Sequence, residues 1–314
     1  MTEPAIAVVG AGAMGGLWAA RLARGGNPVV VVDVVPEIVA AINAQGIAVE
    51  SPNGSQDPVR LRATTDPEEV GPVDVAWCFV KAHHTASAAA LAKPLVGPST
   101  TVVTQQNGWG SADVLAETFR PEQVVVGVTY HSARVDAPGR VAHTGTGASF
   151  LGPYLDGADL ARAEAVARLM NDAGLEATAT AAVKSEIWKK LILNTATLPT
   201  SALTRLRTGE LGQPGPLLDL LDALAAESVQ VARALGYGID LAERIDRIHT
   251  LLAGGGSGKA SMLQDVEAGR KTEIEVVNGA VVRAAEPLGI DVPLNRAMVA
   301  LVGSLERSYL EALR

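Results

Sequence analysis

The chain has 314 residues, of which 48% are hydrophobic and 19% are charged, and its formal net charge is -8. This composition excludes a disordered chain, and the length suits two domains of roughly 150 residues each. The acidic balance argues against a nucleic-acid partner, because such proteins present a basic face to the phosphate backbone.

The chain's single cysteine and its apolar runs bear on its compartment. One cysteine, Cys78, leaves no internal disulfide, and we expect it to be a small buried hydrophobe. Asp33 and Pro36 interrupt the longest valine run, so no stretch approaches the roughly 20 apolar residues of a membrane span. The N-terminus carries no signal-peptide pattern. We therefore expect a cytoplasmic enzyme or binding protein without a membrane partner.

Strand-like segments alternate with helix-like ones in the first half of the chain. Almost continuously apolar strands separated by helical patterns predict an α/β fold, a Rossmann-type doubly wound parallel sheet. The pair Asn53-Gly54 is a hairpin signal and predicts a small excursion. Residues 140–153 predict a late antiparallel pair that completes the sheet. The predicted parallel strands are residues 5–10, 28–33, 73–80, 100–106 and 123–130.

Helical periodicity replaces the strand signals in the second half. We predict a dinucleotide-binding domain over residues 1–181 and an all-helical C-terminal domain over residues 182–314, which would bind substrate and dimerise. The stretch GGGSG at 254–258 predicts a flexible break, and it lacks the Lys-Ser/Thr pair of a phosphate-binding loop. The predicted helices are residues 183–198, 216–236, 241–254 and 292–313.

A glycine turn follows the first strand and opens a helix. Gly10 permits the tight turn, Gly12 lets the backbone approach a pyrophosphate, and Gly15 lets the helix pack close to the strand. Asp33 stands 21 residues after Gly12, where a carboxylate accepts from a ribose hydroxyl. The alternatives are a turn used only for packing and a solvated Asp33. The segment predicts a dinucleotide site formed by Gly10, Ala11, Gly12, Ala13, Met14, Gly15 and Asp33.

The surroundings of Asp33 predict which dinucleotide binds. A carboxylate there repels a 2′-phosphate, and no Arg or Lys occurs between Val29 and Ala44 to attract one. We therefore expect NAD rather than NADP.

Polar residues stand out in the second half. Lys190 and Asn194 are spaced i, i+4 and share one helix face. Thr272 to Glu275 fit a capping box, which would start a helix after Gly269 and place Glu273 in its first turn. By spacing alone, a solvated lysine at 190 and a carboxylate that favours the helix dipole at 273 remain the better interpretations.

Five motifs, in this order, carry a resemblance over nearly the whole chain: VVGAGAMGG, VKAHHT, TQQNGWG, WKKLILN and KASMLQDVEAGRKTEIEVVNGAVV. With them the sequence resembles the ketopantoate reductase (2-dehydropantoate 2-reductase) family. The resemblance implies a site between a Rossmann domain and a helical domain, where NAD(P)H reduces a small-molecule 2-oxo acid, as in pantothenate biosynthesis.

The resemblance also implies residue roles. Lys190 matches the proton donor, whose ammonium would stabilise the oxyanion that hydride transfer creates. Asn194 and Ser261 match substrate-binding residues, and Asn107 matches a residue that contacts cofactor and substrate. Glu273 matches the acidic residue, which would hold the ammonium in place. Cofactor contacts are further implied at Lys81, Glu273 and the backbone of Ala133.

Four positions bear on the identity of the substrate and cofactor. Leu198 and Thr208 stand where the family has asparagines that contact ketopantoate, and Val34 replaces the basic residue that selects NADP. We expect Leu198 and Thr208 to line the substrate site and to favour a more apolar 2-oxo acid. Trp109 either lines that end of the pocket or packs beneath its loop.

Two rival functions remain open: an NAD-dependent D-2-hydroxy acid dehydrogenase, and a redox sensor that binds NAD(H) without turnover. A sensor needs no proton donor, which counts against it. The five histidines show no metal-ligand spacing, so we expect no metal. We expect structural roles for them, with His83 and His84 facing apart on a helix and His84 nearest the cofactor. A homodimer fits the apolar helical domain.

Overall fold

The computed structural model describes residues 3–51, 54–55 and 57–311. Its contacts divide the chain into a sheet unit, Met1–Gln106 with Ser111–Lys184, and a helical unit, Asn107–Gly110 with Ser185–Arg314. We predicted one boundary, after residue 181. The reassignment of the turn at 107–110 to the helical unit has no counterpart in the sequence pattern.

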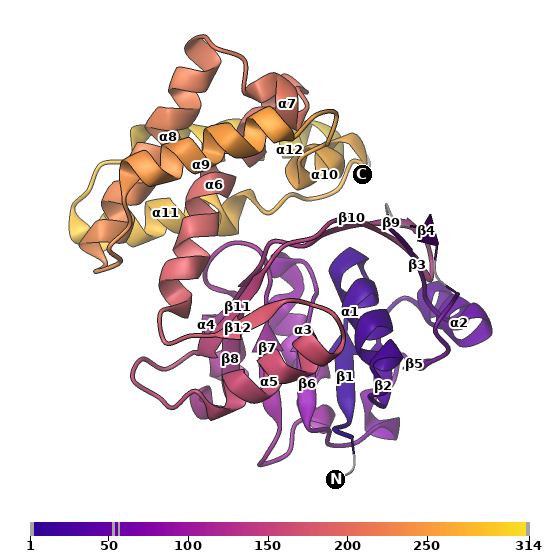
Figure 1. Cartoon of the computed structure of the whole chain (residues 1–314). Coiled ribbons are helices and arrows are strands. Elements are labelled where there is room, and N and C mark those ends of the chain that lie inside the picture. Colours follow the sequence, from indigo (N-terminus) through magenta and orange to yellow (C-terminus); the bar gives the residue numbers. More distant parts are fainter. Residues whose placement is uncertain (1–2, 52–53, 56, 312–314) are drawn as a thin grey trace. The chain divides into compact units, whose positions relative to one another are not determined.

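The sheet unit is built on an eight-stranded sheet with the order β12-β11-β8-β7-β6-β1-β2-β5 (Figure 1). All five predicted strands lie in it side by side and parallel, which confirms the doubly wound fold. At the edges of this sheet, β5 is parallel to β2, whereas β11 is antiparallel to β8 and parallel to β12. The strands are β1 (Ile6–Val9), β2 (Val29–Val32), β5 (Arg62–Thr64), β6 (Val75–Cys78), β7 (Thr101–Thr104), β8 (Val124–Thr129), β11 (Ser149–Pro153) and β12 (Ala177–Ala179).

A second sheet of four strands has the order β4-β3-β10-β9. It contains the excursion predicted near Asn53, although Asn53 itself lies outside the described residues. The prediction of an antiparallel pair within 140–153 is wrong, because β10 pairs with β9 and β3 while β11 pairs with β8 and β12. Alternating hydrophobicity identifies a strand but not its partner, which non-local pairing decides. These strands are β3 (Ala48–Ser51), β4 (Gly54–Ser55), β9 (Ser132–Ala137) and β10 (Arg140–Gly145).

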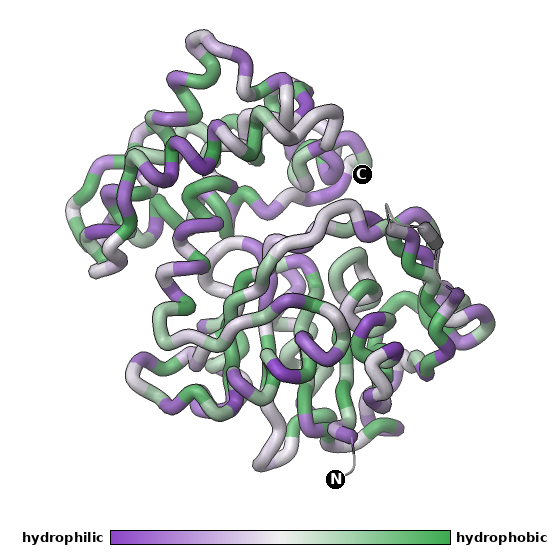
Figure 2. The backbone as a smooth tube through the Cα atoms, in the orientation of Figure 1, coloured by the Kyte–Doolittle hydropathy of each residue, from purple (hydrophilic) through white to green (hydrophobic). Residues whose placement is uncertain are grey.

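Helices cover both faces of the large sheet. Ile6 and Val8 belong to one buried cluster and Ala7 and Val9 to another, because successive side chains of a strand point to opposite faces. The central strands are accordingly hydrophobic along their whole length (Figure 2). The helices are α1 (Ala13–Arg24), α2 (Pro36–Gln45), α3 (Thr85–Leu91), α4 (Ser111–Thr118) and α5 (Ala161–Asp172), with 3-10 turns η1 (Pro67–Glu69), η2 (Ala82–His84), η3 (Lys93–Leu95) and η4 (Pro121–Gln123).

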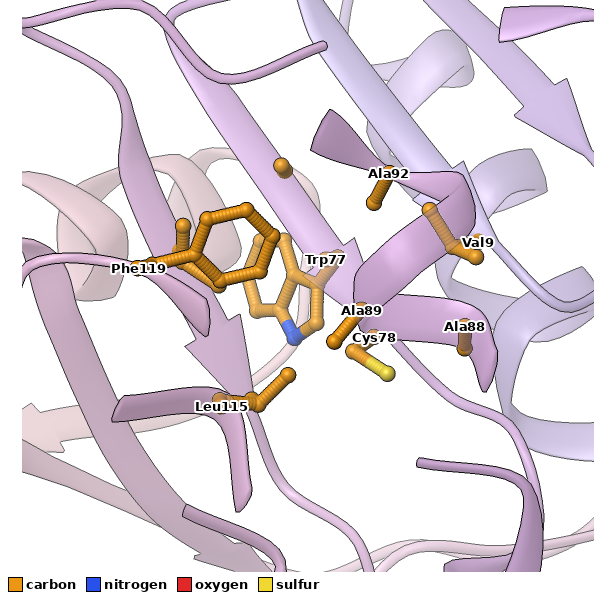
Figure 3. Close-up of a pocket in the computed structure, with 10 residues that line it drawn as sticks. Val9, Trp77, Cys78, Ala88, Ala89, Ala92, Leu115 and Phe119 are labelled. Carbon is orange, nitrogen blue, oxygen red and sulfur yellow. The ribbon is translucent and has the colours of Figure 1, made fainter. Parts of the chain in front are cut away.

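A small apolar cavity of about 10 Å³ lies between the sheet and the helices α3 and α4 (Figure 3). Its walls include Cys78, Ala89, Leu115 and Phe119. A buried water needs two to four polar partners, which these walls do not offer. Burial raises the pKa of the Cys78 thiol to about 11, so it stays protonated and packs as the predicted small hydrophobe.

The helical unit confirms the predicted all-helical C-terminal domain. Its core includes the fully buried Trp188, Leu191 and Ile192 of α6. Among the residues that the structure describes, no helix is both long and apolar enough to span a bilayer. The elements are α6 (Val183–Thr204), α7 (Thr208–Leu211), α8 (Pro216–Ala234), α9 (Leu241–Gly254), α10 (Ser261–Glu267), η5 (Ile274–Val276), α11 (Asn278–Ala285), η6 (Glu286–Leu288) and α12 (Pro293–Leu310).

Candidate active site

The glycine turn joins β1 to α1 in the sheet unit. Gly10 has φ +95°, and a side chain there would meet Val80 Cγ1 at 3.0 Å. A Cβ on Gly15 would lie only 1.9 Å from the Gly10 carbonyl oxygen, so packing excludes any other residue. A Cβ on Gly12 would meet nothing within 4 Å. Two glycines therefore shape the turn, whereas the third leaves open space beside the start of α1.

The N-terminus of α1 fits an anion such as a pyrophosphate. Gly12 is the residue before the helix and offers no side chain to cap it, and no acidic residue occurs in the first turn. The amides of Ala13, Met14 and Gly15 therefore lie at the positive end of a 12-residue helix, beside the open space at Gly12. This segment satisfies the geometric requirements of a dinucleotide site.

Asp33 connects this turn to the end of β2. Its Oδ2 accepts from the Ala11 amide at 2.7 Å, and its Oδ1 accepts from the Val35 amide at 3.0 Å. Each carboxylate oxygen retains lone pairs for a further donor, such as a ribose hydroxyl. Val34, the next residue, is 70% exposed and apolar. Asp33 was predicted to accept from a ribose hydroxyl. Its carboxylate also holds the glycine turn in place through the Ala11 amide, a role that spacing did not indicate.

Further candidate residues of the sheet unit follow β6. Lys81 precedes the 3-10 turn η2, and the prediction that His83 and His84 face apart on a helix is wrong, because their ring centroids are 4.3 Å apart. Gln106 braces this segment through its Nε2, which donates to Val80 O at 2.7 Å and to Thr85 Oγ1 at 2.9 Å. No local pattern marks Gln106, because Val80 and Thr85 are more than twenty residues away in the chain.

Ala133, whose backbone was predicted to contact the cofactor, lies in β9 opposite His143 of β10. His143 Nε2 is 3.0 Å from His131 Nδ1, and Arg21 Nη2 is 3.5 Å from His143 Nδ1. Burial lowers the pKa of His131 to about 4 and also lowers that of His143. Both rings are therefore neutral at pH 7 and serve as packed hydrogen-bonding groups.

The helical unit places Lys190 at the centre of a polar cluster. Trp188, Leu191 and Ile192 anchor α6 in the core, which leaves Lys190 on another face of the helix. Lys190 Nζ donates to Asn107 Oδ1 at 2.9 Å. These residues lie 83 positions apart in the sequence, yet the resemblance assigned both of them to the site.

The electrostatic environment tunes this lysine. Burial lowers the pKa of Lys190 to about 8, and the nearby Glu273 carboxylate acts in the opposite direction by favouring the charged form. Glu273 is itself only 9% exposed. The ammonium is therefore protonated at neutral pH and needs little driving force to lose its proton, as a general acid requires.

The capping box predicted around Glu273 is wrong. The Thr272 hydroxyl accepts from the Ile274 amide at 3.2 Å and donates to Glu306, whereas Glu275 pairs with Arg283. Glu273 therefore precedes the short turn η5 instead of occupying the first turn of an α-helix. Glu306, which also accepts from the Thr272 amide at 2.7 Å, fixes this segment from α12 and was missed by the sequence analysis.

The remaining candidates occupy three elements of the helical unit. Asn194 is buried one turn beyond Lys190 on α6, with Leu198 one further turn along. Ser261 is the first residue of α10. The Thr208 hydroxyl donates to Gly258 O at 3.0 Å, so the structure gives it a partner within the protein. Its role toward a substrate stays a prediction.

The GGGSG stretch is held in place by backbone hydrogen bonds. Thr208 N donates to Gly258 O at 2.9 Å, and Gly209 N donates to Gly256 O at 3.0 Å. A Cβ on Gly255 would lie 2.4 Å from Thr208 Cγ2. The glycines that predicted a flexible break therefore permit a close approach of two loops.

A proline inside α6 leaves one backbone carbonyl without its helical hydrogen bond, and a residue of α11 supplies the missing donor. Pro199 has no N–H, so the Thr195 carbonyl, four residues earlier, loses its helical partner. Asn278 Nδ2 donates to that carbonyl at 2.9 Å and to Asn295 Oδ1 at 3.0 Å. Asn278 is fully buried. It therefore satisfies the carbonyl next to Asn194. The predicted helix ended at residue 198, whereas α6 continues through Pro199 to Thr204 because this donor compensates for the missing amide.

Comparisons with known proteins find relatives of both the sheet unit and the helical unit. Residues 6–156 match the family described as "Ketopantoate reductase PanE/ApbA", and residues 182–306 match "Ketopantoate reductase PanE/ApbA C terminal". The 2-dehydropantoate 2-reductase of Halobacterium salinarum is 34% identical over 303 residues, which cover 96% of this chain and 99% of the relative. That of Archaeoglobus fulgidus is 32% identical over 302 residues and covers 96% and 97%.

Solved structures agree in fold. D-mandelate dehydrogenase, in a ternary structure with NADH and anilino(oxo)acetate, superposes with a TM-score of 0.91 at 25% identity, covering 97% of this chain and 99% of that one. The 2-dehydropantoate 2-reductase from Geobacter metallireducens GS-15 superposes with a TM-score of 0.90 at 29% identity, covering 96% and 99%.

Proposed function

The chain belongs to the ketopantoate reductase family of oxidoreductases, and from that premise we propose that it reduces the ketone of a 2-oxo acid with a nicotinamide cofactor. The observation that carries the proposal is the environment of Lys190, whose Nζ donates to Asn107 Oδ1 at 2.9 Å and whose pKa burial lowers to about 8. A partly buried lysine with that pKa is suited to general acid catalysis at neutral pH.

The protein's own groups account for the proton and the charge. A nicotinamide cofactor, with its pyrophosphate held at the glycine turn, would supply the hydride. The Lys190 ammonium stabilises the negative charge that develops on the substrate oxygen and then donates its proton there. Burial favours the neutral amine that results, and the Glu273 carboxylate favours renewed protonation. Asn107 keeps Nζ in position, while Asn194 and Ser261 would orient the 2-oxo acid.

Asp33 and Val34 support NAD as the preferred cofactor. A carboxylate at Asp33 disfavours a 2′-phosphate, and the exposed Val34 offers it no positive charge. The NADH bound in the D-mandelate dehydrogenase structure is compatible with this preference.

A second candidate function keeps the same residues and reverses the direction, as an NAD-dependent D-2-hydroxy acid dehydrogenase. The similarity to D-mandelate dehydrogenase favours it, together with the apolar Leu198 in place of a polar contact. Lys190 would then act as the general base, in its neutral form. The family's curated members favour the reductase.

We further propose that the protein is a cytoplasmic homodimer. Leu235, Leu288 and Leu301 of the helical unit are exposed and provide apolar surface for a second copy. Light scattering coupled to size exclusion measures the oligomeric state directly.

Initial rates of NADH and NADPH oxidation, with 2-dehydropantoate and with benzoylformate, test the proposed function. We expect turnover with NADH and at least one of these 2-oxo acids. Rapid reduction of 2-dehydropantoate identifies the pathway reductase, and reduction of benzoylformate alone identifies the apolar-acid dehydrogenase. Binding of NADH without turnover of either acid contradicts the proposal and favours the sensor.

A further inference from the structure

The turn that carries Asn107 is short. Its neighbours in the chain belong to the sheet unit, whereas its own contacts place it in the helical unit. It connects β7 to α4 of the sheet unit, yet Asn107–Gly110 make their contacts in the helical unit while Gln106 and Ser111 do not. Asn107 accepts from the Lys190 ammonium at 2.9 Å. Something in these four residues must therefore hold the turn on the helical unit.

The backbone of the turn lies directly on Val276. The Trp109 amide donates to Val276 O at 2.9 Å. Gly108 has φ +86°, and a Cβ there would lie 2.3 Å from the same carbonyl oxygen. Any side chain at Gly108 would push the turn away from Val276, so this close approach requires glycine.

The Trp109 side chain packs beneath the loop, which was one of the two roles considered for it. Its ring centroid is 5.7 Å from that of Trp188 and 6.3 Å from that of Tyr237, and the Trp188 and Tyr237 rings are 6.0 Å apart. Such aromatic pairs contribute beyond the area that they bury. Trp188 is fully buried in α6, two residues before Lys190.

The turn therefore contacts one short segment of α6 twice. Residues two apart on a helix point about 200° from each other, so Trp188 and Lys190 occupy different faces. Trp109 packs against the first of them and Asn107 accepts from the second. Because one residue, Gly108, separates these two contacts, a shift of the Trp109 ring moves the Asn107 carboxamide as well.

We propose that Trp109 is a positioning residue that holds the Asn107 carboxamide on the Lys190 ammonium. The proposal rests on the proposed function, since the geometry it maintains is that of the general acid. Asn107 Oδ1 favours the charged lysine by accepting its hydrogen bond. Loss of the anchor therefore withdraws that acceptor and lowers the pKa of Lys190, in addition to misplacing the proton donor.

The variant Trp109→Leu tests this. We expect kcat for reduction to fall by about 10- to 100-fold, with a smaller rise in the Kd of NADH, because Asn107 is one of several implied cofactor contacts and the glycine turn is untouched. The decline of kcat at high pH should move to lower pH. Trp109→Phe, which keeps an aromatic ring, should restore most of both properties. Nitrogen-15 NMR of labelled lysines gives the Lys190 pKa without turnover, with its signal assigned by its loss in Lys190→Ala.

Two further variants guard against a simple loss of folding. Gly108→Ala keeps the Trp109 ring but displaces the turn from Val276, so we expect the same shift in the Lys190 pKa. Phe119→Leu truncates a buried ring of the sheet unit and should leave that pKa unchanged. A folded Trp109→Leu with the wild-type pKa and kcat overturns this proposal alone. Full turnover in Lys190→Ala would instead overturn the proposed function.

Discussion

The glycine turn and the Lys190 cluster reach their geometry in different ways. The turn is formed by consecutive residues of one strand-turn-helix segment, and its shape follows from where a Cβ fits and where it does not. The Lys190 cluster brings together side chains from α6, the turn at Asn107 and the segment before η5. Binding geometry thus resides in local backbone, whereas proton-transfer geometry depends on distant side chains.

This difference predicts that cofactor affinity and catalysis can be separated by mutation. We expect Lys190→Ala to lower kcat by about 10²- to 10⁴-fold, because a positioned general acid contributes that much. The Kd of NADH, measured by fluorescence titration, should not change. Steady-state rates at saturating NADH measure the loss.

The neighbouring lysine provides a matched control. Lys189 pairs with Glu186 at 2.7 Å, one turn back on the same helix. Lys189→Ala removes the same charge from α6 and should keep kcat within about twofold of wild type, because Lys189 is engaged with Glu186 and not with Asn107. Equal losses in both variants would show that α6 needs positive charge in general and not a proton donor at Lys190.

The pH dependence examines the cluster without truncating it. The general acid must be protonated, so kcat for reduction should fall about tenfold per pH unit above the Lys190 pKa of about 8. In the oxidative direction the base must be neutral, and the rate should rise up to the same pH. Because the Glu273 carboxylate raises this pKa, Glu273→Gln should move both profiles to lower pH.

Profiles that coincide for wild type and Glu273→Gln would remove Glu273 from the electrostatics of the cluster. The Kd of NADH near neutral pH is measured alongside, because the resemblance also implies a cofactor contact at Glu273.

The third test addresses the glycine turn. Asp33→Ala removes the acceptor of the Ala11 and Val35 amides, and hydrogen bonds to a charged group contribute about 1.5–3 kcal/mol. We expect the Kd of NADH to rise about 10- to 100-fold with kcat at saturation nearly unchanged. Combining it with Val34→Arg should shift preference toward NADPH.

Asp74→Ala is the corresponding control, because Asp74 also accepts from a backbone amide of the sheet unit, that of Ala5 at 2.8 Å. It should leave both dinucleotide affinities unchanged. A wild-type preference for NADPH would contradict our interpretation of Asp33.

The sequence predicted the glycine turn better than the Lys190 cluster, because only the turn is formed by residues close in the chain. Periodicity and glycine spacing predicted the parallel strands and the turn, because both depend on residues close in the chain. The hydrogen bonds of Gln106 to Val80, of Glu306 to Thr272 and of Asn278 to Thr195 join segments more than twenty residues apart. Nothing local distinguishes these three residues from other polar residues. The resemblance supplied Lys190 and Asn107, but the hydrogen bond between them appeared only in the structure.

The smallest expected effect concerns the support of α6. Asn278→Ala leaves the Thr195 carbonyl and Asn295 Oδ1 without this donor, and a buried unsatisfied group costs about 1–3 kcal/mol. Urea denaturation should show that loss in the free energy of unfolding. In a Pro199→Ala background the new amide can donate to Thr195 O, so the same substitution should cost less. The cost that remains comes from Asn295 Oδ1, because no change at position 199 can replace the hydrogen bond that it accepts from Asn278. If Asn278→Ala costs the same in both backgrounds, the proline does not create the need that Asn278 meets, and the shape of α6 near Asn194 must have another origin.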